Sequence, residues 1–162
     1  MAARTLPVEP LVPFKRGAGV TTAQRSKLMG RVRQAGTAPE EAVAAWLRAH
    51  KLGYRRNVRT LPGRPDFANR RAGFAIFVHG CFWHRHPGCP RTTTPARNHE
   101  FWLEKFASNV ARDAARTSEL EQTGLRTITV WECETQNADL LAEKLAQLLE
   151  AQPRQGLGGP NE

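Results

Sequence analysis

The sequence has few cysteines and no long apolar run. Three cysteines in 162 residues, an odd number, and the lack of a recognisable secretory signal disfavour a disulfide scaffold. No stretch approaches the ~18 consecutive apolar residues of a membrane-spanning helix, and no lipidation motif is found. We therefore expect a cytoplasmic protein that does not act on a membrane. Its cysteines should be either buried apolar residues or metal ligands.

Acidic residues are also scarce. Asp and Glu number 15 against 24 Lys and Arg, which gives a net charge of +9. Such a surplus favours a polyanionic partner, and in a chain without a membrane segment we expect that partner to be nucleic acid. The alternative is a basic surface that only keeps the protein soluble.

The two ends of the sequence differ from its middle. Residues 1–20 contain prolines and glycines without hydrophobic periodicity, and we interpret them as a flexible arm. Residues 152–162 have the same character and are expected to form a disordered tail. The intervening residues 21–151 are enough for one domain with its own hydrophobic core.

Helical and strand patterns alternate within this domain. The expected elements are, in order, a helix from Thr37 to Gly53, a strand over 54–58, a hairpin at Gly73, an apolar strand over 74–78, a helix over 99–122, a strand over 125–131 and a helix after Asn137. This order predicts an α/β fold around a mixed sheet.

The helix starts and faces can be predicted in more detail. Thr37 and Glu40 have the spacing of a capping box, and Asn98 and Asn137 are expected to cap the two later helices. In the long helix, the residues expected to face the core are Leu103, Phe106, Val110 and Ala114. In the final helix, the residues expected to point inward are Leu141, Leu145, Leu148 and Leu149.

Histidines and cysteines are concentrated just after the apolar strand. Cys81, His86 and Cys89 lie within nine residues, and Cys133 follows a later strand. Three thiolates and one imidazole make the Cys3His set of a closed structural zinc site. The two groups would meet if the strands before Cys81 and Cys133 are neighbours. The alternative is three buried thiols and an exposed histidine.

A carboxylate and two further histidines are candidates for catalysis. Asp66 follows a Gly-Arg-Pro turn and opens a strand, where a single carboxylate can bind Mg2+ together with substrate phosphate and water. Its alternative role is that of a turn aspartate. His84 can take a proton from a water nucleophile, and His79 can contact a phosphate or the leaving group, or either can be structural. Glu40 joins this site only if it points toward Asp66.

Aromatic and basic residues predict a nucleic-acid surface. Phe82 and Trp83 directly follow Cys81, and a zinc-pinned loop would leave one or both free to stack on bases. On the long helix, the residues that share a second face, distinct from the predicted core face, are Trp102, Lys105, Asn109, Arg112 and Arg116. The alternative for this face is a solvated, salt-bridged surface. Asp113 lies at its boundary, where it can orient His84.

With these residues in view, the sequence resembles the very short patch repair endonucleases of bacteria from about Gln24 to Glu134. The segments that carry the resemblance are Arg25-Ser26-x-x-Met29, Thr37-x-Pro39-Glu40, Leu61-Pro62-Gly63-Arg64-Pro65-Asp66, Phe77 to Cys89, Glu100 to Phe106, Asn109-Val110-x-Arg112-Asp113 and Val130 to Glu134. The run Val-His-Gly-Cys-Phe-Trp-His is specific to this family.

The resemblance implies a restriction-endonuclease-like fold of three layers, with a mixed central sheet and a structural zinc site. It implies Mg2+-dependent nicking of duplex DNA 5′ of the thymine in a T:G mismatch, the product of 5-methylcytosine deamination. Asp66 and the Val78 carbonyl would then bind Mg2+, and His84 would be the general base beside Asp113. His79 and Glu40 would complete the catalytic site. The zinc ligands would be Cys81, His86, Cys89 and Cys133.

By the same resemblance, Phe82, Trp83 and Trp102 would intercalate beside the mismatch. The implied setting is a monomer on the bacterial nucleoid, with mismatch-repair accessory proteins and a DNA polymerase acting downstream. Two other functions stay open from the sequence. One is a nicking endonuclease of broader mismatch specificity, linked to a methylation or restriction system. The other is a catalytically silent, zinc-stabilised DNA-binding module.

Overall fold

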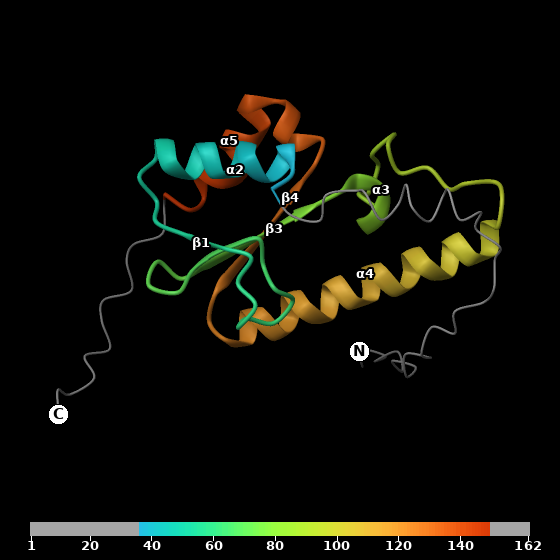
Figure 1. Ribbon diagram of the computed structural model, residues 1–162, viewed down its shortest axis with the longest axis horizontal. Coiled ribbons are helices and arrows are strands. Elements are labelled where there is room, and N and C mark those ends of the chain that lie inside the picture. Colours follow the sequence, from blue (N-terminus) through green and yellow to red (C-terminus); the bar gives the residue numbers. More distant parts are fainter. Residues whose placement is uncertain (1–35, 150–162) are drawn as a thin grey trace, which may run out of the picture.

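The computed structural model describes residues 36–149, and it has a mixed sheet between two helical layers (Figure 1). The strands are β1 (Arg55–Arg56), β2 (Phe67–Asn69), β3 (Phe74–His79) and β4 (Arg126–Trp131), which lie in that order across the sheet. The pairs β1–β2 and β2–β3 are antiparallel, whereas β3 and β4 are parallel. The predicted α/β class with a mixed sheet is thus confirmed. The predicted arm, 1–20, and tail, 152–162, lie outside the described residues.

Helices cover both faces of the sheet. They are α2 (Ala38–Ala49), α3 (Cys81–His84), α4 (His99–Gln122) and α5 (Ala138–Ala146), with a short 3-10 turn, η1 (Glu134–Gln136). In Figure 1, α2 and α5 lie on one face of the sheet and α4 lies on the other. This arrangement of helices on both sides of the sheet confirms the predicted three-layer fold. Among residues 36–149, no helix is long and apolar enough to cross a membrane.

Two hydrophobic clusters fill the spaces between the layers. The cluster under α2 and α5 consists of Val43, Ala44, Leu47, Phe67, Phe74, Ile76, Ile128, Val130, Leu141, Leu145 and Leu148. The cluster under α4 is smaller and consists of Leu61, Ala68, Ala75, Phe77, Leu120 and Leu125. Side chains alternate between the two faces along β2 and β3, as the period of a strand requires. This alternation explains why both strands are apolar almost throughout.

The helix starts follow local chemistry, with one exception. The Thr37 hydroxyl accepts from the Glu40 backbone N–H while the Glu40 carboxylate accepts from the Thr37 backbone N–H, so the predicted capping box is present. Asn137 accepts from two backbone N–H groups at the start of α5, as predicted. Asn98 precedes α4 in a left-handed conformation with φ of 56°, and its side chain makes no capping hydrogen bond. The prediction that Asn98 caps α4 is wrong, because this backbone conformation replaces the extended one that a side-chain cap requires.

The inward face of α4 differs from the prediction. Phe106 is buried, but Leu103 and Val110 are 47% and 44% exposed, and Ala114 is exposed too. Asn109 is 8% exposed and shares the inner face with Phe106. The prediction failed because α4 extends past the sheet beside a polar cleft, so the face with fewer apolar residues is turned inward. Leu149 was likewise expected inside and is 50% exposed.

Gly63 supports the turn that leads to Asp66. Its φ is +71°, and a Cβ at this position would lie 2.9 Å from the Arg116 Cβ and 2.9 Å from the Phe77 ring. We expect Gly63→Ala to lower the free energy of unfolding by about 2–4 kcal/mol, since strain in the left-handed region adds to overpacking. The measurement is urea unfolding. Gly88→Ala is the matched control, because Gly88 has φ of +70° and nothing within 4 Å, and it should cost only about 1 kcal/mol. Equal losses in the two variants would contradict the steric explanation.

Candidate active site and metal centre

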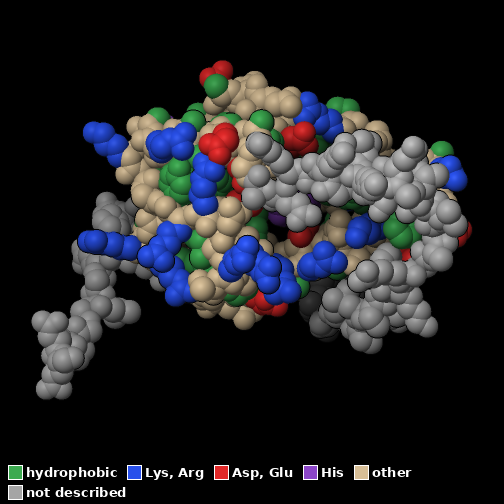
Figure 2. Space-filling view, in the orientation of Figure 1, with side chains coloured by type: hydrophobic (Ala, Val, Ile, Leu, Met, Phe, Trp, Pro, Cys, Tyr) green, Lys and Arg blue, Asp and Glu red, His purple; other side chains and the backbone are tan. Residues whose placement is uncertain are grey.

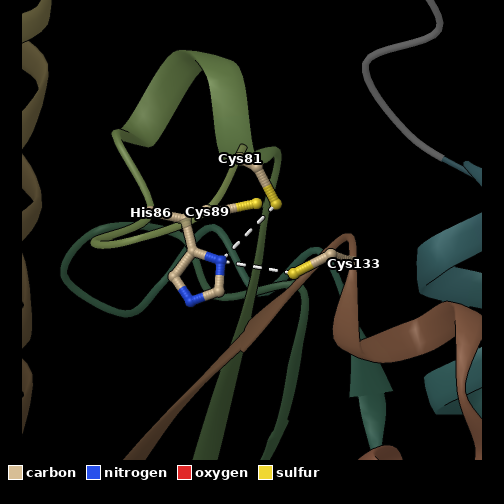
Figure 3. Close-up of side chains that lie close together, drawn as sticks. All are labelled: Cys81, His86, Cys89 and Cys133. Atoms are coloured by element: carbon tan, nitrogen blue, oxygen red, sulfur yellow. Dashed lines mark hydrogen bonds between the residues drawn. The ribbon is translucent and has the colours of Figure 1, made fainter. Parts of the chain in front are cut away.

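The metal centre is assembled by the register of β3 and β4. His79 pairs with Trp131 across these parallel strands. Cys81 comes two residues after His79, and Cys133 comes two residues after Trp131, so the two cysteines leave the sheet at the same level. His86 and Cys89 come from the segment after α3, which folds back toward the same point (Figure 3). The sequence-based condition that the two strands be neighbours is therefore met. The four predicted zinc ligands lie together.

The four ligand atoms have spacings that suit a zinc ion. All lie within 4.8 Å of one another, and the His86 Nδ1 is 3.2 Å from the Cys133 Sγ and 3.8 Å from the Cys81 Sγ. Zn–S bonds of ~2.3 Å and Zn–N bonds of ~2.0 Å at tetrahedral angles place ligand atoms roughly 3.5–3.8 Å apart. The imidazole of His86 also stacks on Trp131, with ring centroids 4.4 Å apart, which orients the ring. The donor set and its geometry fit Zn2+.

A cleft of about 1410 Å³ lies between α4, the ends of β3 and β4, and the start of α2. Its lining includes all five predicted catalytic residues: Glu40, Asp66, His79, His84 and Asp113. Trp83, Trp102, Lys105, Arg112 and Arg116 line the same cleft. Of the predicted DNA-binding residues, Phe82 alone does not line it. The tertiary structure thus brings together residues that are spread over 77 positions from Glu40 to Arg116.

Asp66 stands at the entrance to β2, beside the end of β3. The Val78 backbone N–H donates to the Asp66 Oδ2 at 2.7 Å. Burial raises the pKa of Asp66 to about 6, the Val78 hydrogen bond opposes that rise, and the nearby Glu40 carboxylate adds to it. A carboxylate that is costly to ionise without a cation fits a divalent metal ligand.

The backbone carbonyl of Val78 lacks a ladder donor beside Asp66, and the register of β2 and β3 explains why. Continuing the β2–β3 register beyond Phe67 and Ile76 places Pro65 opposite Val78. A residue in a strand directs its N–H and C=O to the same edge, so the Val78 carbonyl faces this side together with the N–H that Asp66 accepts. Proline has no N–H to donate. Pro65 therefore cannot donate a ladder hydrogen bond to the Val78 carbonyl, and this oxygen could hold a cation together with Asp66.

His84 and Asp113 form a hydrogen-bonded pair in the cleft. The His84 Nδ1 lies 2.5 Å from the Asp113 Oδ2, so Nδ1–H donates to the carboxylate and Nε2 is the nitrogen that can accept a proton. His79 stacks on His84, with centroids 4.0 Å apart and planes 13° apart. Burial, with His84 second, lowers the pKa of His79 to about 4, so His79 is neutral near pH 7. The ligand atoms of His79, His84 and Asp113 also lie within 4.8 Å of one another, so these three residues could hold a metal ion as well as transfer protons.

Glu40 has two roles that the sequence presented as alternatives. Its carboxylate accepts from the Gly36 N–H at 2.9 Å and from the Thr37 hydroxyl at 2.8 Å, which are the contacts of the helix cap. Glu40 is also 5% exposed, lines the cleft and raises the pKa of Asp66. The capping box therefore holds a second carboxylate in place near the first.

The predicted stacking residues form one aromatic cluster at the mouth of the cleft. Phe82 contacts Trp83 and Trp102, with ring centroids 5.0 Å and 5.7 Å away, and the cluster rests on the buried Phe106. The Asn109 side-chain amide donates to the Trp83 carbonyl oxygen at 3.0 Å and so ties α3 to α4. Phe82, Trp83 and Trp102 are each half-buried. They belong to neither main core cluster and keep partly exposed ring surface.

Two cationic residues of the cleft were missed in the sequence. Arg59 and Arg64 line the cleft together with Lys105, Arg112 and Arg116. The signal that could have found them is the shortage of acids: between Glu41 and Glu100, Asp66 is the single acidic residue among eleven Lys and Arg residues. The lining of the cleft thus combines a few acidic residues and histidines with five cationic side chains.

The raised pKa of Asp66 has a consequence for stability. A carboxyl whose folded pKa of about 6 exceeds the unfolded value of 3.8 destabilises the fold above pH 6, and this cost vanishes below pH 4. We expect Asp66→Asn to stabilise the zinc-loaded protein by about 2–3 kcal/mol at pH 7.5 in the absence of Mg2+, and by little at pH 4.5. Thermal unfolding across this pH range measures the effect. Glu121→Gln, at an exposed position, is the control, and a pH-independent difference for Asp66→Asn would contradict the burial explanation.

A three-layer α/β fold with a half-buried carboxylate at the end of a mixed sheet, histidines in the same cleft and cationic residues in its lining defines a restriction-endonuclease-like nuclease. The comparisons with known proteins agree. The family described as DNA mismatch endonuclease Vsr matches residues 19–90. The DNA mismatch endonuclease Vsr of Escherichia coli K12 is 42% identical over 129 residues, covering 79% of this chain and 82% of that protein.

Two further relatives carry the name of type II nicking enzymes. V.NmeAIP of Neisseria meningitidis is 37% identical over 129 residues, which is 80% of this chain and 91% of the relative. V.XorIIP of Xanthomonas oryzae is also 37% identical over 129 residues, covering 78% of this chain and 93% of the relative. The chain belongs to the Vsr family of DNA mismatch endonucleases, and it is a nuclease.

Proposed function

We propose that this nuclease nicks one strand of duplex DNA on the 5′ side of the thymine in a T:G mismatch, in a reaction that depends on Mg2+. The observation that carries the proposal is the meeting of Asp66 with the His84–Asp113 pair in a cleft that has cationic walls. The E. coli relative is named a DNA mismatch endonuclease, and others are named nicking enzymes. The proposed endonuclease domain spans residues 21–151.

The proposed catalytic roles follow from the site geometry. Asp66 and the Val78 carbonyl would hold Mg2+, which when bound stabilises the negative charge that develops on the phosphoryl oxygens. His84 accepts a proton at Nε2 from the attacking water, while Asp113 holds its ring and stabilises the imidazolium that forms. His79, which is neutral, can donate a hydrogen bond toward the leaving oxygen. The Glu40 carboxylate raises the pKa of Asp66, so the ionised form of Asp66 gains more from a bound cation.

The zinc ion would have a structural role. Four protein ligands leave no open position for water or substrate. The ion would hold the segment 81–89 against the end of β4, and this segment carries both the general base His84 and the aromatic residues of α3. Zinc thus positions the catalytic site without taking part in the chemistry.

We further propose that Phe82, Trp83 and Trp102 insert beside the mismatch, while Lys105, Arg112 and Arg116 bind the DNA backbone. Unstacking a T:G mismatch costs less free energy than unstacking a Watson–Crick pair, and this difference gives selectivity for the mismatch. Acting as a monomer on the nucleoid in the bacterial cytoplasm, the enzyme would leave a nick for a DNA polymerase, with mismatch-repair accessory proteins as further partners.

The test of the proposed reaction is nicking of a labelled duplex that carries one T:G mismatch, with Mg2+, beside a fully paired duplex. A single nick next to the mismatched thymine supports the proposal. Cutting at several other mismatches would instead favour the broader nicking endonuclease, a reading consistent with the type II nicking enzymes among the relatives. Binding without any nick in all sequence contexts would contradict the proposal.

The wedge assignment has its own test. Trp83→Ala should lower the ratio of T:G to paired-duplex binding by about ten- to a hundredfold, since base stacking on an aromatic is worth about 1–3 kcal/mol. Binding to fully paired DNA should change little. Trp83→Phe is the matched variant and should retain part of the preference. An unchanged ratio in Trp83→Ala would remove this residue from the wedge.

A further inference from the structure

The cationic surface continues from the cleft to the far edge of the sheet. A second hollow of about 560 Å³ has Arg55, Arg70 and Arg71 in its lining, and Leu61 lines both this hollow and the catalytic cleft. Arg59 and Arg64 line the cleft on the near side of Leu61. In Figure 2, Lys and Arg side chains follow one another below the opening in which histidine atoms are visible, and they extend to the side of the sheet edge. The arginines therefore form a track that leads away from the catalytic centre.

These arginines are not used to stabilise the fold. Within residues 36–149, Arg55, Arg59, Arg64, Arg70 and Arg71 are exposed and make no ion pair or side-chain hydrogen bond. Other cations of the same surface that have an acid within reach do pair, as Arg56 does with Glu41 at 2.9 Å. Keeping five like charges close together without acids opposes folding through self-repulsion. Such a cluster is expected where a polyanion binds.

The track has a direction and a length. Arg70 and Arg71 lie in the turn between β2 and β3, at the opposite end of β2 from Asp66. The three residues of β2 lie between Asp66 and Arg70, so four residue steps of extended chain span roughly 13 Å at ~3.3 Å per residue. Duplex DNA rises ~3.4 Å per base pair along one strand. For a duplex whose axis follows β2, the turn would therefore lie about four base pairs from a phosphate held at Asp66.

We propose that Arg55, Arg70 and Arg71 form a second DNA-contact surface, which binds the phosphate backbone of the substrate duplex about four base pairs to one side of the scissile phosphate. This proposal rests on DNA being the substrate of the cleft. Arg59 and Arg64 bridge the surface to the catalytic centre. The contact reads no base sequence, because flexible arginines at a sheet edge meet phosphates and not a groove. It anchors one flank of the duplex while the aromatic cluster engages the mismatch.

The experiment measures equilibrium binding of fluorescent duplexes without Mg2+, so that no nick is needed for the readout. We compare wild type with Arg70→Gln/Arg71→Gln, and with Lys144→Gln as the control, because Lys144 lies on α5, across the sheet from α4. The double variant should bind a long duplex roughly five- to thirtyfold more weakly, and its log–log salt slope should fall by about 1–2. The Lys144→Gln variant should behave as wild type.

Shortened duplexes make the test specific to this surface. Trimming one flank to fewer than about four base pairs from the mismatch should weaken wild-type binding and remove the difference between wild type and the double variant. Trimming the other flank should leave that difference intact. Arg55→Gln provides an independent variant outside the turn, with an expected loss of roughly three- to tenfold.

Either of two results would overturn the inference. One is a salt slope of the double variant equal to that of the control, and the other is a loss of affinity that persists equally after either flank is trimmed. A failure of the proposed T:G specificity looks different, because it removes the mismatch preference and leaves the arginine-dependent binding to paired DNA in place. Matching unfolding temperatures for the variants establish that the fold is intact.

Discussion

Asp66→Ala should reduce the single-turnover nicking rate by three or more orders of magnitude and leave duplex affinity within a few-fold of wild type. Asp66 is a half-buried carboxylate of the cleft, and its carboxyl accepts from the Val78 N–H beside the carbonyl that we propose as the second ligand. Losing the cation's stabilisation of the phosphoryl charge removes several kcal/mol, and ~1.4 kcal/mol corresponds to a tenfold change in rate. Affinity is expected to persist because the arginines and aromatic residues remain.

The comparison that isolates this effect uses three variants under saturating enzyme. Asp66→Asn should be as inactive as Asp66→Ala, because the neutral amide is isosteric but a poor ligand for Mg2+. His84→Ala should lose about two to four orders of magnitude, which is the usual contribution of a general base. Glu121→Gln, on the exposed surface of α4, should retain full activity. Near-normal nicking by Asp66→Asn would remove Asp66 from the reaction.

Loss of the zinc ion should unfold the region around α3. The purified protein should contain about one zinc per chain, and Cys133→Ser should lose the metal together with most of the cooperative unfolding transition. Three thiolates and one imidazole in this compact arrangement contribute metal-binding energy directly to folding, of the order of 10 kcal/mol in small zinc domains. Since net domain stabilities are only about 5–15 kcal/mol, the fold is not expected to survive this loss intact.

The measurement combines elemental analysis with thermal unfolding followed by circular dichroism, before and after treatment with a zinc chelator. His99→Ala is the control, because His99 is exposed and lies outside the ligand cluster. It should keep both the metal and the transition. A metal-free preparation that unfolds at the same temperature as the zinc-loaded one would contradict the structural role.

Features that depend on neighbours in the chain were predictable. The start of α2 follows from Thr37 and Glu40, since a capping box requires only residues three positions apart. Helix α4 was predicted with its observed ends, His99 and Gln122. The four members of the Cys/His cluster could also be named as candidate metal ligands, because three cysteines and one histidine match a known coordination set whatever the fold that assembles them.

Features that depend on what packs against an element were not predictable. The outward turn of Leu103 and Val110 follows from the cleft beside α4, because a polar cleft reverses the usual rule that the more apolar face of a helix is inside. The left-handed backbone at Asn98 likewise reflects the approach of the preceding loop and not the capping propensity of asparagine. Helical periodicity identifies the two faces of α4 but not which of them meets the sheet.

The sequence by itself determined the fold class, and it predicted the Cys/His cluster and the carboxylate and histidines that we propose for catalysis. Only the tertiary structure placed Glu40 beside Asp66, joined His84 to Asp113 and extended the arginines from the cleft to the sheet edge. The physical reason is the distance along the chain over which each interaction acts. Ligand chemistry and helix caps are properties of residue types and short spacings, whereas the meeting of distant side chains depends on strand register and on which helix covers which face.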